Sequence, residues 1–121
     1  MINGIQVSEN FKLREFESPD TKQVMLDPEL LWLLQALRTR IGKPVHVKSG
    51  YRTAQHNRAV KGARDSNHKE GKASDCYVIG MEPVDLANEA KAVGFIGIIV
   101  YHTKGYVHLD VREKPYIRGV M

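Results

Sequence analysis

The sequence has almost no cysteine and no long apolar segment, and both absences limit the kind of protein it can encode. A single cysteine, Cys76, excludes an internal disulfide, so the fold must rest on packing and on any metal it binds. No stretch approaches the roughly 18 consecutive apolar residues that indicate a membrane span. The first ten residues also lack the basic patch and apolar core of a signal peptide. We therefore expect no membrane span. If the target of the protein lies outside a membrane, we expect something other than a signal peptide to deliver the protein.

Internal repeats, low-complexity tracts and interdomain linkers are missing as well. With 121 residues, of which 42% are hydrophobic, the chain can build one modest core but not two. We expect one domain over residues 1–121, acting as a monomer.

The formal net charge of +4 is mild, and the basic residues are scattered along the chain. A nucleic-acid binder would concentrate them in a stripe with aromatic side chains ready to stack on bases, and no such stripe is present. We therefore expect no nucleic-acid partner. A mild positive charge suits any polyanion, including a cell wall that bears phosphate or carboxylate groups.

Two segments have the signals of amphipathic helices. Asp27 is a good N-cap, Pro28 suits the first helical position, and leucines recur at helical spacing until Gly42 ends the segment. Residues 83–93 repeat the pattern with a proline at the start and a glycine after the end. A shorter helix is expected over residues 54–61, capped by Thr53.

Four segments alternate or are apolar in the manner of strands, over residues 44–48, 72–79, 95–101 and 106–111. The last two are joined by a turn, which predicts a hairpin whose apolar first strand is central in the sheet. The expected fold class is α+β, with helices packed on a mainly antiparallel sheet.

Within residues 72–79, the period of two places Asp75 on one face together with Ala73, Tyr77 and Ile79. We expect this to be the core face, where an unpaired carboxylate would be costly and a metal could supply its partner. In the last predicted strand, His108 and Asp110 share the face opposite to the apolar residues.

Zinc takes neutral imidazole and carboxylate ligands, and a catalytic site uses three protein ligands. His68, Asp75 and His108 could supply this set. By residue type alone, they could equally be separate surface groups, because the chain has five histidines.

Three motifs in order, SGYR at 49–52, S-x-H-x-x-G-x-A-x-D at 66–75 and H-x-D at 108–110, resemble the signature of the zinc D-Ala-D-Ala carboxypeptidase and peptidoglycan endopeptidase family. The similarity covers nearly the whole chain and is greatest to the small single-domain branch of bacterial cell-wall hydrolases and phage lysis proteins, the endolysins. The resemblance implies the Hedgehog/DD-peptidase fold and the ligands His68, Asp75 and His108 for Zn²⁺.

The resemblance also implies roles around the metal. Arg52 matches an arginine that polarises the scissile carbonyl or holds the substrate, and Ser66 and Tyr51 lie at positions expected to contact the substrate. Asp110 is expected to orient His108, the support that metal-bound imidazoles usually have.

One position departs from the family pattern. Many relatives carry an acid three residues before the last zinc histidine as the catalytic base, and here Gly105 stands there. His102, at the predicted turn, is the first candidate for the base because imidazole has a suitable pKa. Asp110 is the second.

The expected function is zinc-dependent hydrolysis of peptide bonds in peptidoglycan stem peptides or cross-links, as a carboxypeptidase or an endopeptidase at the bacterial cell wall. The alternative is a non-catalytic module that keeps zinc for stability and binds the wall or forms part of a phage virion.

Overall fold

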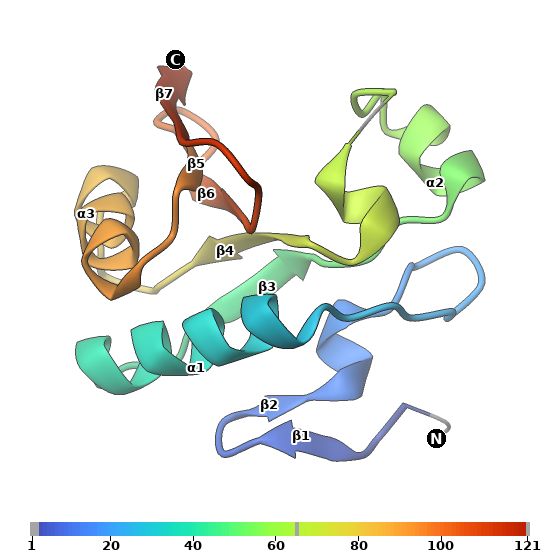
Figure 1. Ribbon diagram of the computed structural model, residues 1–121, viewed down its shortest axis with the longest axis horizontal. Helices are drawn as coiled ribbons and strands as arrows, with labels where there is room; N and C mark the ends of the chain where they lie inside the picture. The colour runs from blue at the N-terminus through green and yellow to red at the C-terminus, as the bar shows by residue number, and fades with distance from the viewer. Residues whose placement is uncertain (1–2, 65, 121) are drawn as a thin grey trace.

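The computed structural model describes residues 3–64 and 66–120, and its central feature is a five-stranded sheet (Figure 1). The strands of this sheet are β3 (His46–Ser49), β4 (Ala73–Tyr77), β5 (Gly97–Tyr101), β6 (Tyr106–Asp110) and β7 (Tyr116–Val120). The helices are α1 (Pro28–Ile41), α2 (Ala54–Ala59) and α3 (Pro83–Val93), with two 3₁₀ turns, η1 (Leu13–Phe16) and η2 (Asn67–Glu70). The predicted α+β class is confirmed.

The sheet is mainly antiparallel, in the order β3-β4-β6-β5-β7, and only β5 and β7 run parallel. Residues 97–101 form an inner strand as predicted, because β5 lies between β6 and β7, although β6 is the middle strand of the five. An apolar run indicates a strand covered on both sides, but it does not give the order of strands in the sheet.

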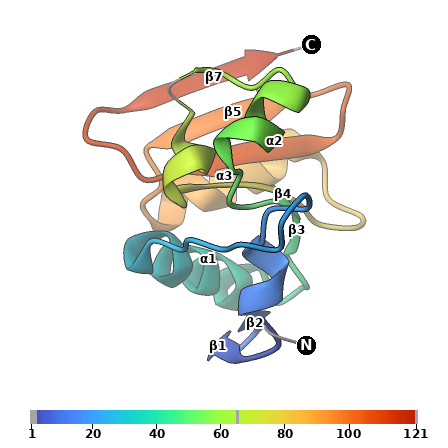
Figure 2. The same cartoon turned by 90° about the vertical axis from the view of Figure 1, so that its right-hand side faces the viewer.

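The two faces of the sheet have different roles. Helices α1 and α3 cover one face, while α2 and η2 lie over the other (Figure 2). The covered face holds the core, with Cys76, Ile98, Val107 and Leu109 all buried. The opposite face carries Asp75 of β4 and His108 and Asp110 of β6, so the candidate site lies on the side away from the two long helices.

The predicted orientation of β4 is therefore reversed. Tyr77 is 39% exposed and Ile79 is 74% exposed, whereas Cys76 and Val78 on the other face are buried in the core. A period of two separates the faces of a strand, but here both faces are partly apolar and the pattern did not say which one points inward.

The predicted helix ends agree with the structure. The Asp27 carboxylate accepts hydrogen bonds from the backbone N–H groups of Glu29 and Leu30, at 2.9 and 3.2 Å, and Gly42 ends α1 in the left-handed conformation. Helix α3 matches its predicted bounds. Helix α2 is shorter than expected and ends at Ala59.

Two elements were not predicted. A small hairpin of β1 (Gln6–Ser8) and β2 (Phe11–Lys12) precedes η1. Strand β7 follows the β5–β6 hairpin near the C-terminal end of the chain. None of the helices in the described ranges has the length and apolar character needed to cross a membrane.

Candidate metal centre

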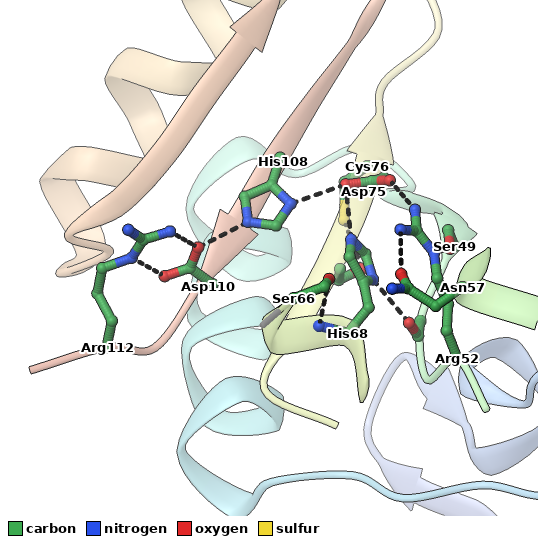
Figure 3. A network of polar contacts seen from close by, with 12 residues as sticks. Ser49, Arg52, Asn57, Ser66, His68, Asp75, Cys76, His108, Asp110 and Arg112 are labelled. Atoms are coloured by element: carbon green, nitrogen blue, oxygen red, sulfur yellow. Dashed lines mark hydrogen bonds and ion pairs between the residues drawn. The ribbon is translucent and has the colours of Figure 1, made fainter. Parts of the chain in front are cut away.

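His68, Asp75 and His108 meet on the open face of the sheet (Figure 3). Asp75 and His108 are direct cross-strand partners in β4 and β6, and η2 brings His68 to the same point. All three side chains are buried. Residues 33 positions apart in the sequence are thus held together by strand register.

The three side chains converge on one oxygen. Asp75 Oδ1 lies 3.2 Å from His68 Nε2 and 3.1 Å from His108 Nδ1, and the three candidate ligand atoms lie within 4.8 Å of one another. At this spacing, the three atoms could all bind one metal ion placed between them.

The far side of each imidazole fixes which nitrogen carries hydrogen. His68 Nδ1 lies 2.7 Å from the carbonyl oxygen of Gly50, and a carbonyl can only accept, so Nδ1 is the donor. In neutral His68, Nε2 then presents a lone pair toward Asp75.

His108 is oriented in the same way by Asp110. Its Nε2 lies 2.6 Å from Asp110 Oδ2, and Arg112 donates to both oxygens of the same carboxylate. Burial would raise the pKa of Asp110, but the hydrogen bonds from Arg112 and His108 lower it overall, so Asp110 is an ionised acceptor. Nε2 of His108 is the donor, and Nδ1 of the neutral ring presents its lone pair to Asp75.

Two lone pairs and a carboxylate oxygen therefore face one another in a buried space. This arrangement requires either extra protons on the imidazoles or a cation. Burial would lower the pKa of His108, but its hydrogen bonds to Asp110 and Asp75 raise it overall. The pKa of Asp75 is raised by burial and lowered more strongly by its hydrogen bonds to His108 and His68. Two imidazole nitrogens and one carboxylate oxygen, each imidazole held by an outer hydrogen bond, fit the ligand set of a zinc ion.

Arg52 holds the second oxygen of Asp75. Its Nη2 donates to Asp75 Oδ2 at 3.2 Å, its Nε to Ser49 Oγ at 3.1 Å and its Nη1 to Asn57 Oδ1 at 3.3 Å. The guanidinium therefore fixes the carboxylate so that Oδ1 faces the imidazoles. Its expected contact with the substrate stays a prediction.

A register shift in β3 explains why Ser49 reaches the site. Val47 pairs with Cys76 and Ser49 pairs with Asp75, so two residues of β3 oppose one residue of β4 across the shift at Lys48. Such a bulge re-aims the side chains that follow it. Ser49 is thereby turned to the Asp75 face, where its hydroxyl accepts from Arg52.

Several residues that support the site were missed from the sequence. Asn57 is buried and links Arg52 to the carbonyl of Ala63 through its amide, at 2.8 Å. Gly50 must be glycine because an added Cβ would lie 2.6 Å from Phe16 Cα. Arg112 could have been found, since it continues the two-residue spacing of His108 and Asp110.

Small residues surround Asp110 on the neighbouring strands. Ala73 and Gly97 are its cross-strand partners, and Asp110 itself is fully buried. A Cβ added at Gly97 would lie 1.7 Å from Asp110 Oδ1 and 2.7 Å from Arg112 Nε. The carboxylate and the guanidinium therefore occupy the space that a side chain at position 97 would need.

The remaining predicted site residues lie in different places. Ser66 lines the cavity, and its hydroxyl caps η2 by accepting from the N–H of His68 at 3.2 Å. Tyr51 is not among the described residues that line the cavity. Asp110 lies behind His108 with both oxygens bonded, which favours the orienting role over that of a base.

The structure does not bring His102 into the site. His102 is exposed at the β5–β6 turn, its N–H donates to the carbonyl of Val120 at 2.9 Å, and its ring lies over Gly119 of β7. Tyr101, Lys104 and Tyr106 line the cavity, but His102 is not among the described residues of its lining. The role of His102 as a base stays a prediction, which this placement disfavours. Gly105 has a φ of 82°, a conformation that an acidic residue would adopt only with strain.

A cavity of about 580 Å³ opens over the metal centre. Besides the three candidate ligands, its lining includes Arg52, Lys61, Lys104, Tyr101 and Tyr106. The cavity is therefore rich in cations and phenol groups.

Comparisons with known proteins agree with one another. The family model for peptidase M15 matches residues 5–110. The chain is 28% identical over 108 residues to the peptidoglycan L,D-endopeptidase MepK of Escherichia coli strain K12, covering 84% of the chain and 58% of that protein. It is 30% identical over 109 residues to a protein of Haemophilus influenzae named as a probable peptidoglycan L,D-endopeptidase MepK, covering 83% of the chain and 59% of that protein.

A shorter match joins the chain to the zinc D-Ala-D-Ala carboxypeptidase of Streptomyces albus G, with 37% identity over 70 residues. This match covers 57% of the chain and 28% of that protein. The chain thus spans less than two thirds of the length of each of these relatives.

Proposed function

The chain belongs to the peptidase M15 family, as its three motifs predicted, and from this premise we propose that it is a zinc peptidase that hydrolyses peptide bonds in peptidoglycan. The observation that carries the proposal is the convergence of two imidazole lone pairs and one carboxylate oxygen in a buried space beneath an open cavity. Relatives named as a peptidoglycan L,D-endopeptidase and as a zinc D-Ala-D-Ala carboxypeptidase support the substrate class and the metal.

We propose His68, Asp75 and His108 as the zinc ligands. Zinc in such a site acidifies a water molecule and polarises a carbonyl group. The chain's own contribution is to hold the three ligand atoms in place, through Gly50 behind His68, Arg52 behind Asp75 and Asp110 behind His108.

Arg52 lines the cavity and carries a positive charge next to the ligands. We propose that it also stabilises negative charge that develops on the substrate carbonyl oxygen, because a fixed charge in a partly buried site acts more strongly than in water. Ser66, whose hydroxyl lies at the cavity wall, is the candidate hydrogen-bonding partner for the substrate.

We further propose the Hedgehog/DD-peptidase fold, a single domain over residues 1–121 and action as a monomer at the bacterial cell wall. The ligands and the residues that orient them all come from one chain, which supports a site that needs no partner subunit. The test below also shows whether the cleaved bond is at the end of a stem peptide or within a cross-link.

The test is digestion of purified peptidoglycan, with and without a chelator, with mass spectrometry of the products and detection of new amine ends. We expect new amine ends only without the chelator, and their loss in His68→Ala and His108→Ala. His56→Ala, a histidine of α2 outside the cavity lining, is the matched control and should keep the activity. Binding of peptidoglycan without new amine ends would refute catalysis and favour the non-catalytic zinc module.

A further inference from the structure

Next to the metal centre, the open face of the sheet carries a second group of side chains, formed by Lys48, Tyr77, Tyr101, Lys104 and Tyr106. We call it the tyrosine–lysine surface. Tyr101 and Tyr106 are cross-strand partners whose rings stack with centroids 4.7 Å apart and an interplanar angle of 25°. Tyr77 lies two positions beyond Asp75 on β4 and stacks on His46 at 5.0 Å. Aromatic rings thus cross four adjacent strands.

An ammonium group lies over each of the two stacked phenol rings. Lys104 Nζ is 5.5 Å from the centre of the Tyr101 ring, and Lys48 Nζ is 5.5 Å from the centre of the Tyr106 ring. Within residues 3–64 and 66–120, neither ammonium has a carboxylate within ion-pair distance. Both lysines are exposed, so their charges face solvent and any bound molecule.

The β3 bulge is what lets Lys48 and Ser49 share this face. Without the register shift, the positions after Val47 would alternate simply between the two faces, and Lys48 and Ser49 could not both point to the Asp75 side. Ser49 contacts Arg52 at the metal centre, while Lys48 reaches the Tyr106 ring. The bulge therefore supplies one side chain to each part of the face.

The tyrosine–lysine surface is continuous with the metal centre. Tyr106 and His108 are two positions apart in β6, about 7 Å along the strand. Tyr101, Lys104 and Tyr106 line the same cavity as the candidate ligands. A bound peptide in an extended conformation, lying along β6, rises as much per residue as the strand does. If one of its bonds lies at the metal centre, the residue two positions from that bond therefore lies over Tyr101 and Tyr106.

We propose that the tyrosine–lysine surface is a binding subsite for an acidic peptide segment of the substrate, with substrate carboxylates paired to Lys48 and Lys104. The peptide chain and its methylene groups lie on the phenol rings. The inference rests on the proposed function, because it assigns this surface to the substrate of the same site. An uncharged glycan would use the rings but would leave both lysines unpaired, so charge complementarity favours the peptide.

Binding to the intact chain tests the inference without requiring hydrolysis. The probes are two synthetic stem tetrapeptides of the same sequence, one with free carboxylates and one with every carboxylate made a carboxamide. Titration calorimetry is carried out in the presence of a chelator, so that the proposed reaction cannot consume the probe. We expect the acidic peptide to bind more tightly, and its affinity to fall as salt rises.

Charge-neutralising variants identify the residues. Lys48→Gln and Lys104→Gln should each weaken binding of the acidic peptide by about two- to fivefold, the range for an exposed ion pair, and leave the carboxamide peptide unchanged. Lys91→Gln in α3, on the opposite face of the sheet, is the matched control for net charge and should bind like the wild type. Circular dichroism of each variant checks that it is folded.

The outcomes separate this inference from the proposed function. Equal binding of the two peptides, or equal loss of binding in the Lys91 variant, overturns the inference even if the zinc-loaded chain cuts peptidoglycan. A preference for the acidic peptide that depends on Lys48 and Lys104 supports the inference even if no bond is cut. Tight binding of a peptide-free glycan that competes with the acidic peptide and is insensitive to both lysine variants also overturns it.

Discussion

Gly97→Ala should weaken zinc binding although position 97 contributes no ligand. The added Cβ would lie 1.7 Å from Asp110 Oδ1, 2.3 Å from Asp110 Cγ and 2.7 Å from Arg112 Nε. Real Cβ atoms do not approach other atoms so closely, and the nearest group is a fully buried carboxylate rather than the end of a flexible chain. The Asp110 side chain must therefore move, and with it the hydrogen bond that orients His108.

The magnitude follows from what Asp110 does for His108. Loss of the outer hydrogen-bond partner of a metal-bound imidazole typically costs about 10- to 100-fold in metal affinity, or about 1.4 to 2.7 kcal/mol. Overpacking the buried site costs a further amount of about 1 to 3 kcal/mol in the free energy of unfolding. Both losses should appear in the same variant, the first in zinc affinity and the second in the metal-free protein.

The assay is competition for zinc against a chromogenic chelator, with thermal unfolding of the metal-free protein measured in parallel. Gly105→Ala is the control, because its positive φ makes alanine strained while nothing lies within 4 Å of the added Cβ. This control should lose about 1 kcal/mol of stability and keep its zinc affinity. If Gly97→Ala binds zinc within twofold of the wild type, Asp110 does not control His108 and the reasoning is refuted.

Three further predictions concern the core, the helix cap and pH. Burial raises the pKa of the Cys76 thiol to about 12, so a thiol reagent at pH 8 should label it only after unfolding, and rapid labelling of the native protein would contradict its place in the core. Asp27→Ala removes the cap of α1 and should lower the free energy of unfolding by about 0.5 to 2 kcal/mol in denaturant titration, whereas Asp27→Asn should recover most of the loss. Zinc must displace the proton of His108, whose pKa is raised above its ordinary 6.5, so zinc affinity should rise about tenfold per pH unit below that raised pKa and level off above it. The same shift predicts that metal-free stability from this group is fully present below pH 6.5 and is lost as pH rises through the raised pKa. Zinc affinity that is flat between pH 6 and 8 would count against His108 as a ligand.

The helices could be predicted because their signals are local. Asp27, Pro28 and Gly42 each act on the backbone of one helix end, and the observed bounds of α1 follow them. The order of strands and the inward face of β4 could not be predicted in this way, because both depend on which distant segment packs against the strand. The short strand β7 escaped notice because most of its side chains are exposed and it has little apolar alternation.

The candidate ligands and the orienting role of Asp110 could be proposed from motif spacing, but the groups that hold His68 and Arg52 could not. His68 depends on a backbone carbonyl at Gly50, which no side-chain pattern reveals. Ser49 reaches Arg52 only because β3 carries a register shift, and the motif SGYR gives no direct sign of it. The position of the His102 ring could not be predicted for a related reason, since proximity in sequence to His108 does not say on which side of the hairpin the ring lies.

Part of the chain's positive charge lies around the cavity over the metal centre. Arg52 forms an ion pair with Asp75, and Arg112 forms an ion pair with Asp110. These two cations therefore hold the candidate ligands in position. Lys61 and Lys104 line the same cavity without an acidic partner among its described residues, and a divalent cation at the centre would add to their potential. A cavity with this balance favours anionic groups on the substrate and on the carbonyl oxygen as it reacts. The net charge, which gave no direction in the sequence, thus supports the proposed preference for acidic peptides.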